Sequence, residues 1–244
     1  MAAAAPDPND DPNEFFKRRP PYDKDVSFDQ TNLEEDQKQV AEESEKIFKT
    51  FLYTRLLSDI ERDSEDGEMC VGEITTPVIH QIRDEKTNME EKFNQDEQDK
   101  KILELGQMLA AVGDNYNKKY DFQSIVGNLN IEHEEFAYTS FTNVARKLVV
   151  GGLNWGRILA LFLFGYEIAL SFLRKGHSGV YGLLKRILKY MVKFLFKEGI
   201  VNWIIEQGGW IKFKLQENRE SVNYALMILA SLLAGYGAYR LYNR

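Results

Sequence analysis

The stretch Leu153–Phe172, LNWGRILALFLFGYEIALSF, decides how this chain folds. It is almost continuously apolar, but it carries the charged residues Arg157 and Glu167. Each charge would cost roughly 2.5–3.5 kcal/mol at the centre of a bilayer, and about ten strongly apolar residues would return roughly 0.3–0.6 kcal/mol each. Because the two contributions nearly cancel, we predict a helix buried at the centre of a helical bundle, apolar enough to meet lipid if the bundle opens.

The rest of the chain is predicted to be all-α. Hydrophobic residues make up 43% of the 244 residues and charged residues 28%, as in a globular protein. All six prolines lie at or before Pro77, and the apolar residues beyond it recur at three- and four-residue steps. We expect one helical bundle over residues 31–215, preceded by a disordered acidic segment over residues 1–30.

Local signals place the individual helices. Thr31 and Glu34 form a T-x-x-E pattern, which is typical of a capping box and predicts a helix from there to about Leu57. The acidic residues 58–98 are interpreted as a long mobile loop with a short helix near residues 85–93. Further helices are expected over residues 100–121, 132–149, 180–197 and 201–207, and over the central run after an Asn154 cap.

Composition excludes several classes of function. The first hundred residues are acidic and the remainder is basic, but the basic residues are mixed with long apolar runs, so no nucleic-acid partner is expected. Cys70 is the one cysteine, which favours a reducing compartment. His80, His133 and His177 lie far apart, and no catalytic motif occurs. We therefore expect neither a metal site, nor a cofactor, nor an enzyme.

The carboxyl end is predicted to be a membrane anchor. Residues 221–239 carry no charge, and as a helix they would span about 28 Å, close to the thickness of a hydrocarbon core. Arg219 and Glu220 precede this run, and Arg240 and Arg244 follow it. We expect a tail anchor over residues 219–244, and the alternative is a carboxy-terminal core helix.

A lysine repeat marks the helix expected over residues 180–197. Lys185, Lys189, Lys193 and Lys197 recur every four residues between leucines and aromatic residues. Such a helix suits a membrane surface, with its ammonium groups at the lipid headgroups. The same pattern also fits an ordinary solvated face.

Three short motifs follow one another along the chain. LAAVGD, residues 109–114, lies in a helix whose apolar positions are spaced as in helices that dock into grooves. GGLNWGR, residues 151–157, opens the central helix, and WIIEQGGW, residues 203–210, comes after the lysine repeat. The residues of interest are Leu105, Leu109, Val112, Gly113, Asp114 and Tyr116 in the first motif region, Asn154, Trp155, Gly156 and Arg157 in the second, and Trp203, Gly208, Gly209 and Trp210 in the third.

In order and spacing, these motifs resemble the three homology segments of the Bcl-2 family of apoptosis regulators. The resemblance covers about residues 33–244 and is strongest over 101–211. It implies a Bcl-2-like helical bundle in which the second motif helps to form a groove for amphipathic ligand helices. Within that groove, Arg157 would pair with the carboxylate of Asp114 or of its counterpart in a ligand helix.

The resemblance also implies a function and a place in the cell. The expected protein is a pro-apoptotic effector on the mitochondrial outer membrane, with a single span and the bulk of the chain in the cytosol. A ligand helix would open it, and copies of it would then form dimers and higher oligomers that permeabilise the membrane. Its expected partners are other Bcl-2 family proteins and their ligand helices, a second copy of itself, and mitochondrial lipids. The alternatives are a pro-survival member that sequesters ligand helices and a membrane tether with no role in death.

Overall fold

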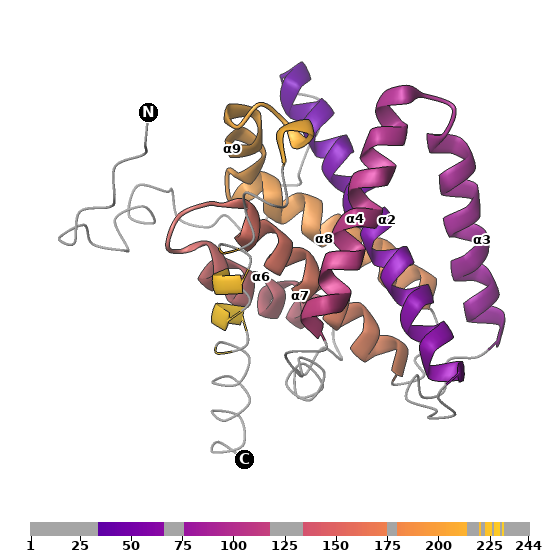
Figure 1. Ribbon diagram of the computed structural model, residues 1–244. Coiled ribbons are helices and arrows are strands. Elements are labelled where there is room, and N and C mark those ends of the chain that lie inside the picture. The colour runs from indigo at the N-terminus through magenta and orange to yellow at the C-terminus, as the bar shows by residue number, and fades with distance from the viewer. Residues whose placement is uncertain are drawn as a thin grey trace, which may run out of the picture.

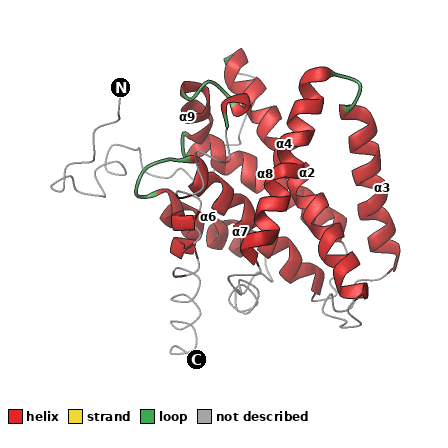
Figure 2. Cartoon of the chain, viewed as in Figure 1, coloured by secondary structure: helices red, strands yellow, loops and turns green. Residues whose placement is uncertain are grey.

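The computed structural model describes residues 34–65, 76–117, 134–174 and 180–213, with residues 220, 223–225, 227–229 and 231 near the carboxyl end. In this part of the chain every regular element is a helix, which confirms the all-α prediction (Figures 1 and 2). The elements are α2 (Glu35–Glu65), α3 (Thr76–Phe93), α4 (Glu97–Asn117), α6 (Glu134–Val149), α7 (Trp155–Arg174), α8 (Val180–Lys197), α9 (Ile200–Glu206) and the 3-10 turn η2 (Trp210–Lys212).

Helix α7 lies at the centre of the bundle and contacts α2, α4, α6 and α8. From Leu159 to Phe164, each of six consecutive side chains exposes at most 2% of its surface. Six residues exceed one turn of 3.6, so the helix is covered on every side. Fully burying a side chain such as Leu or Phe contributes about 1.5–3 kcal/mol. The predicted central helix therefore contributes strongly to the hydrophobic stabilisation of the bundle.

Helix α2 packs along α7 through aromatic rings. The ring centroids of Phe48 and Phe51 lie 4.9 and 5.9 Å from that of Phe162. The helix runs to Glu65 rather than ending near Leu57. It continues because Arg55 and Asp59, one turn apart, form a buried ion pair of 3.7 Å, so the polar residues there do not break the helix.

The start of α2 differs from the expected capping box. The helix begins at Glu35, and the carbonyl of Glu34 accepts the first helical hydrogen bond, from the amide of Lys38 at 3.0 Å. Thr31 lies outside the described residues.

The predicted long loop over residues 58–98 is wrong for most of its length. In place of a short helix near residues 85–93 there is the 18-residue α3, which lies at the right of Figure 1 beside α2 and α4. Ile82, Met89 and Phe93 are buried, and Lys49 and Glu85 form an ion pair of 3.3 Å between α2 and α3. This apolar stripe is narrow and most other positions are polar or charged, so the amino-acid composition of the segment resembles that of a loop.

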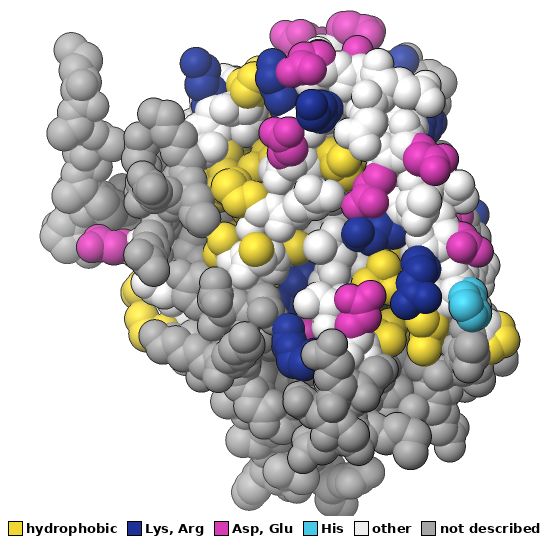
Figure 3. All heavy atoms as spheres, turned by 45° about the vertical axis from the view of Figure 1, so that its right-hand side comes forward, with side chains coloured by type: hydrophobic (Ala, Val, Ile, Leu, Met, Phe, Trp, Pro, Cys, Tyr) yellow, Lys and Arg dark blue, Asp and Glu magenta, His cyan; other side chains and the backbone are white. Residues whose placement is uncertain are grey.

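The remaining helices follow the sequence closely. Helices α6, α8 and α9 begin or end within two residues of the predicted bounds, where periodicity and glycines mark them. On the face shown in Figure 3, charged side chains of both signs are interrupted in places by hydrophobic ones. No helix in the described ranges is both long and apolar enough to cross a bilayer. Most of the predicted span over residues 221–239 lies outside those ranges.

Candidate functional site

The predicted groove motif lies at the amino-terminal end of α7. Gly152, with a φ of 97°, turns the chain after α6, because this conformation is rarely open to a residue with a side chain. Asn154 caps α7, and its side-chain oxygen accepts a hydrogen bond of 2.9 Å from the amide of Arg157. The predicted Asn154 cap is therefore confirmed.

Arg157 is buried although it opens an apolar helix. It exposes 8% of its surface, and its Nη1 donates a hydrogen bond of 2.8 Å to the carbonyl of Gly152. A Cβ on Gly151 would lie only 2.5 Å from the guanidinium group, so that glycine makes room for the charge. Burial lowers the pKa of Arg157 below its ordinary value, and the nearby Tyr224 acts in the opposite sense.

Aromatic rings bring the second and third motifs together. The ring centroid of Trp155, on α7, lies 5.0 Å from that of Trp203, on α9. It also lies 5.2 Å from Trp210 and 5.3 Å from Phe213, at η2 and just after it. Such contacts contribute about 0.5–1.5 kcal/mol each beyond the burial of their area. Segments almost fifty residues apart thus form one cluster.

The third motif is ordered by its two glycines. Gly208 and Gly209 have φ values of 86° and 81°, and their amides bond back to Ile205 and Ile204 at 2.9 Å each. This geometry ends α9 and turns the chain back onto the bundle. It places the indole Nε1 of Trp210 where it donates a hydrogen bond of 2.8 Å to Ser44 of α2.

The first motif, on α4, faces into the bundle. Leu109 exposes 2% of its surface, and Leu105 and Val112 are half-buried against the same core. At Gly113 a Cβ would lie 2.9 Å from Leu163 of α7, so the absence of a side chain allows α4 to approach α7 closely. The side chains of Asp114 and Tyr116 lie outside the described residues. Their contacts therefore remain predictions, including the pair between Asp114 and Arg157.

The described residues of the carboxy-terminal segment pack on the bundle. Ala225 and Leu229 are fully buried and belong to the same hydrophobic core as Trp155, whereas Tyr224 and Met227 are exposed. Tyr224 also influences Arg157 electrostatically. This segment therefore covers part of the surface around the groove motif.

The lysine repeat of α8 points away from the core to differing extents. Lys185 and Lys189 are exposed, and Lys193 and Lys197 are half-buried. The opposite side of the helix, which includes Leu184, Ile187, Leu188, Met191 and Leu195, is buried against the rest of the bundle. The apolar side of α8 would therefore have to leave the bundle before it could contact lipid.

A buried polar network joins α2 to α7, and it was not predicted. The Tyr166 hydroxyl donates a hydrogen bond to Asp59, which also pairs with Arg55 and, at 3.1 Å, with Arg62. Burial, and then the charge of Asp59, raise the pKa of Tyr166 well above its ordinary value. The available sequence signal was the four-residue spacing of Arg55 and Asp59 within an apolar helix.

No group of three or more His, Cys, Asp or Glu side chains in the described part of the chain is arranged to hold a metal ion.

Known proteins share this order of segments. The profile of the apoptosis regulator proteins of the Bcl-2 family matches residues 109–210, which include all three motifs. The chain is 28% identical to human Bcl-2 homologous antagonist/killer (Bak) over 201 residues, 82% of this chain and 84% of the relative.

Two other relatives match a shorter region. The identity is 33% over 112 residues with Gallus gallus Bcl-2-like protein 1, or 45% of this chain and 47% of that protein. It is 28% over 118 residues with Mus musculus apoptosis regulator BAX, or 48% and 58%. The region matched by the family profile contains the buried α7 and, from the aromatic cluster, Trp155, Trp203 and Trp210. The chain belongs to the Bcl-2 family of apoptosis regulator proteins.

Proposed function

We propose that this chain is a pro-apoptotic effector that forms homo-oligomers and permeabilises the mitochondrial outer membrane after a ligand helix binds at the groove beside Arg157. One observation carries the proposal: α7 is buried on every side although it is apolar enough to approach the composition of a membrane span. Lipid is an alternative environment for such a helix once its neighbours leave. The similarity to Bak along most of both chains supports the same conclusion.

Membership of the Bcl-2 family supports the general part of this proposal. Bcl-2 family proteins are regulators rather than enzymes, in agreement with the sequence prediction. Membership also implies that the chain binds the ligand helices of other family members.

The proposed activation begins at α4. In the closed bundle Leu109 is buried and Leu105 and Val112 are half-buried, so most of the ligand-helix face packs against the chain's own core. A ligand helix opens the bundle only if it binds the open state better than the closed one. The freed α4 would then dock in the groove of a second copy. There Asp114 would pair with Arg157 through charge-assisted hydrogen bonds.

The membrane steps use three further segments. The tail over residues 219–244 would anchor the chain, with its bulk in the cytosol. The open bundle would lay the apolar sides of α7 and α8 on the bilayer, with Lys185 and Lys189 at the anionic headgroups. This order of events agrees with α8 being packed into the closed bundle.

A pro-survival role is the second candidate. The 33% identity to Bcl-2-like protein 1 over 112 residues favours it. Such a protein would bind the same ligand helices in its groove without permeabilising the membrane.

A leakage assay separates these roles. Full-length protein is added to dye-filled liposomes with the lipid composition of the mitochondrial outer membrane. The probe is a synthetic peptide of residues 99–120 of this chain, which contains the ligand-helix segment. The control is the same peptide with Leu109→Glu, because a charge in an apolar pocket is costly. The substitution is made in the peptide alone, since Leu109 is also part of the closed core.

Each outcome selects one role. Leakage with the native peptide and none with the control supports the effector. Peptide binding without leakage replaces the effector by the pro-survival role. Absence of binding at micromolar concentrations overturns both and leaves a tether with no role in death.

A further inference from the structure

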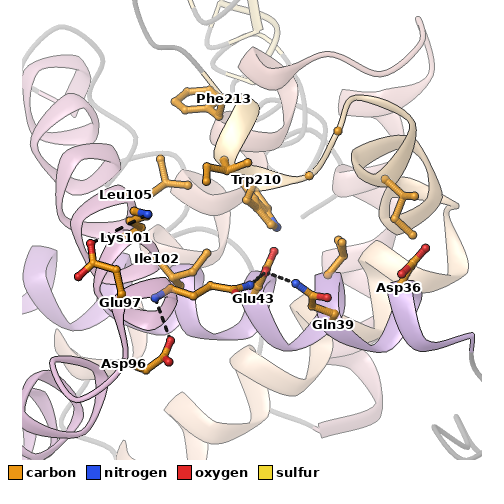
Figure 4. A pocket seen from close by; sticks show the side chains of 16 residues that line it. Asp36, Gln39, Glu43, Asp96, Glu97, Lys101, Ile102, Leu105, Trp210 and Phe213 are labelled. Atoms are coloured by element: carbon orange, nitrogen blue, oxygen red, sulfur yellow. Dashed lines mark hydrogen bonds and ion pairs between the residues drawn. The ribbon is translucent and has the colours of Figure 1, made fainter.

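A pocket lies at the amino-terminal end of α2, beside the aromatic cluster that includes Trp210 and Phe213. It has a volume of about 770 Å³ and lies between α2, the start of α4 and the turn from α9 to η2 (Figure 4). We propose that this amino-terminal pocket binds the chain's own segment Phe15–Arg19, FFKRR, which precedes α2. The binding of this segment is independent of the proposed function. The effect of that binding on activation rests on the proposed function.

The pocket has an apolar floor. Val40, Ile102, Trp210 and Phe213 are buried and line it, and Leu105 is half-buried beside them. Ile211, which also lines the pocket, exposes 71% of its surface and is the most exposed large hydrophobic residue among those described. The volume falls within the range of roughly 300–1,000 Å³ typical of ligand pockets. The pocket can therefore accept aromatic side chains.

The rim of the pocket is acidic. Asp36, Glu43, Asp96 and Glu97 line it, and among the described residues of the lining Lys101 is the one basic side chain. Lys101 Nζ lies 4.0 Å from Glu97, so its charge offsets a single carboxylate. The helix amino termini of α2 and α4 add only about half a positive charge each. The rim therefore keeps a net negative charge and favours a cationic ligand.

The acidic groups are held in place by neutral donors. Glu43 accepts hydrogen bonds from the side chains of Gln39 at 3.0 Å and Gln98 at 2.8 Å. Asp96 caps α4 and accepts hydrogen bonds from the amides of Gln98 and Asp99 at 2.8 and 3.0 Å. Amide donors orient a carboxylate without neutralising it. The rim is thus fixed in position and still available to a guanidinium or ammonium group.

The proposed occupant matches both properties. Phe15 and Phe16 suit the apolar floor, and Lys17, Arg18 and Arg19 suit the acidic rim. Residues 20–34 connect this segment to α2, and a chain of that length reaches up to about 50 Å, ample for a pocket whose rim includes Asp36 in the first turn of α2. Because the segment is tethered, its effective concentration is on the order of millimolar. That advantage favours it over a second copy or a free peptide.

Occupancy would link three elements that activation must separate. A segment bound there would contact α2, the start of α4 and the turn after α9 together. Under the proposed function, it would hold α4 in the closed bundle and delay opening.

Disulfide trapping in the full-length chain tests the proposal. Cys70→Ser removes the native thiol, and Glu14→Cys places a thiol beside the segment without altering FFKRR. The partner thiol is Gln39→Cys, which lines the pocket, and the matched control is Lys38→Cys, exposed on the same helix but outside the lining. The tether lengths of the two pairs differ by one residue. Equal thermal unfolding midpoints establish that the variants fold alike.

The expected result is about tenfold faster intramolecular cross-linking at position 39 than at position 38. A docked segment holds Glu14→Cys near position 39, whereas a free tether would reach both positions about equally often. Reversing the charges with Lys17→Glu, Arg18→Glu and Arg19→Glu, or raising the salt to about 1 M, should remove the difference. Equal rates at the two positions, or selectivity that survives charge reversal, would overturn the proposal.

The remaining outcomes concern other occupants. Disulfide-linked dimers would assign the pocket to a second copy. Binding of an added labelled peptide of residues 12–22, without selective internal cross-linking, would assign it to an external basic segment. Either result overturns docking of the chain's own segment. Because the assay needs neither membrane nor ligand helix, its failure is distinct from failure of the leakage assay.

Discussion

The guanidinium group of Arg55 lies over the ring of Tyr166, with Cζ 4.6 Å from the ring centroid. Arg55 is on α2 and Tyr166 is on the central helix α7, and both are fully buried. The carboxylate of Asp59 contacts both side chains. This network ties α2 to the helix that we propose to be released, so it should influence how easily the bundle opens.

Tyr166→Phe should lower the free energy of unfolding by about 1–3 kcal/mol, because buried Asp59 loses a hydrogen-bond donor. Tyr166→Leu should cost more, since the ring under Arg55 is also lost. Urea denaturation monitored by circular dichroism measures both effects. Equal stability of the native protein and the Phe variant would mean that the hydroxyl contributes nothing.

Stability should also fall at alkaline pH because of the same tyrosine. Burial raises the pKa of Tyr166, so the folded state holds the phenolic proton more tightly than the unfolded chain does. This contribution is full below the unfolded pKa of about 10 and is lost as the pH rises above it. Urea denaturation at several pH values from 8 to 11 should therefore show a smaller alkaline loss for Tyr166→Phe. Parallel pH profiles for the two proteins would contradict this account.

Gly106→Ala should destabilise the bundle although alanine favours helices. A Cβ at this position would lie 2.6 Å from Cβ of Thr50 and 3.0 Å from the carbonyl oxygen of Ile47, where the backbone of α2 cannot easily move. The expected loss is about 1–3 kcal/mol, as for other overpacked sites. Under the proposed function, the same variant should cause leakage at lower peptide concentrations.

The matched control is Gly182→Ala on α8, where a Cβ would meet nothing within 4 Å. It should stabilise the protein by up to about 1 kcal/mol through helix propensity alone. If both alanine variants shift the unfolding midpoint in the same direction, close packing of α4 on α2 is not the cause.

Ser44→Ala should cost about 1–3 kcal/mol, because the buried indole Nε1 of Trp210 loses its acceptor. The same substitution in a Trp210→Phe background should cost much less, since no donor remains to be satisfied. A double-mutant cycle of unfolding free energies measures this coupling. Additive losses would show that the hydrogen bond does not hold the third motif on α2.

Gly151→Ala should weaken binding of the peptide of residues 99–120. The new Cβ would displace the guanidinium group of Arg157 and break its bond to Gly152. The displaced guanidinium group could then no longer pair with Asp114 of the peptide. Loss of that charge-assisted hydrogen bond costs about 1.5–3 kcal/mol, or roughly ten- to hundredfold in affinity. Fluorescence anisotropy with the labelled peptide measures the loss. In an Arg157→Ala background the glycine substitution should have no further effect, and a persisting loss would exclude Arg157 as its cause.

Much of the fold was predictable from the sequence because it depends on local patterns. The apolar run of α7 outweighs its two charges, and three- and four-residue spacing marks the buried sides of α4 and α8. The Asn154 cap could be predicted for the same reason, since donor and acceptor lie three residues apart. The order of the three motifs likewise led to the family.

Tertiary structure decided what depends on neighbours distant in sequence. Only the second half of helix α3 was predicted, because its few apolar residues gain stability only when α2 lies beside them, and its other residues are as charged as a loop. The contact of Trp210 with Ser44 and the burial of Arg55 against Tyr166 join residues more than a hundred positions apart. Periodicity shows which side of a helix avoids water. Only the packed chain determines which partner covers that side, because burial is a property of two surfaces.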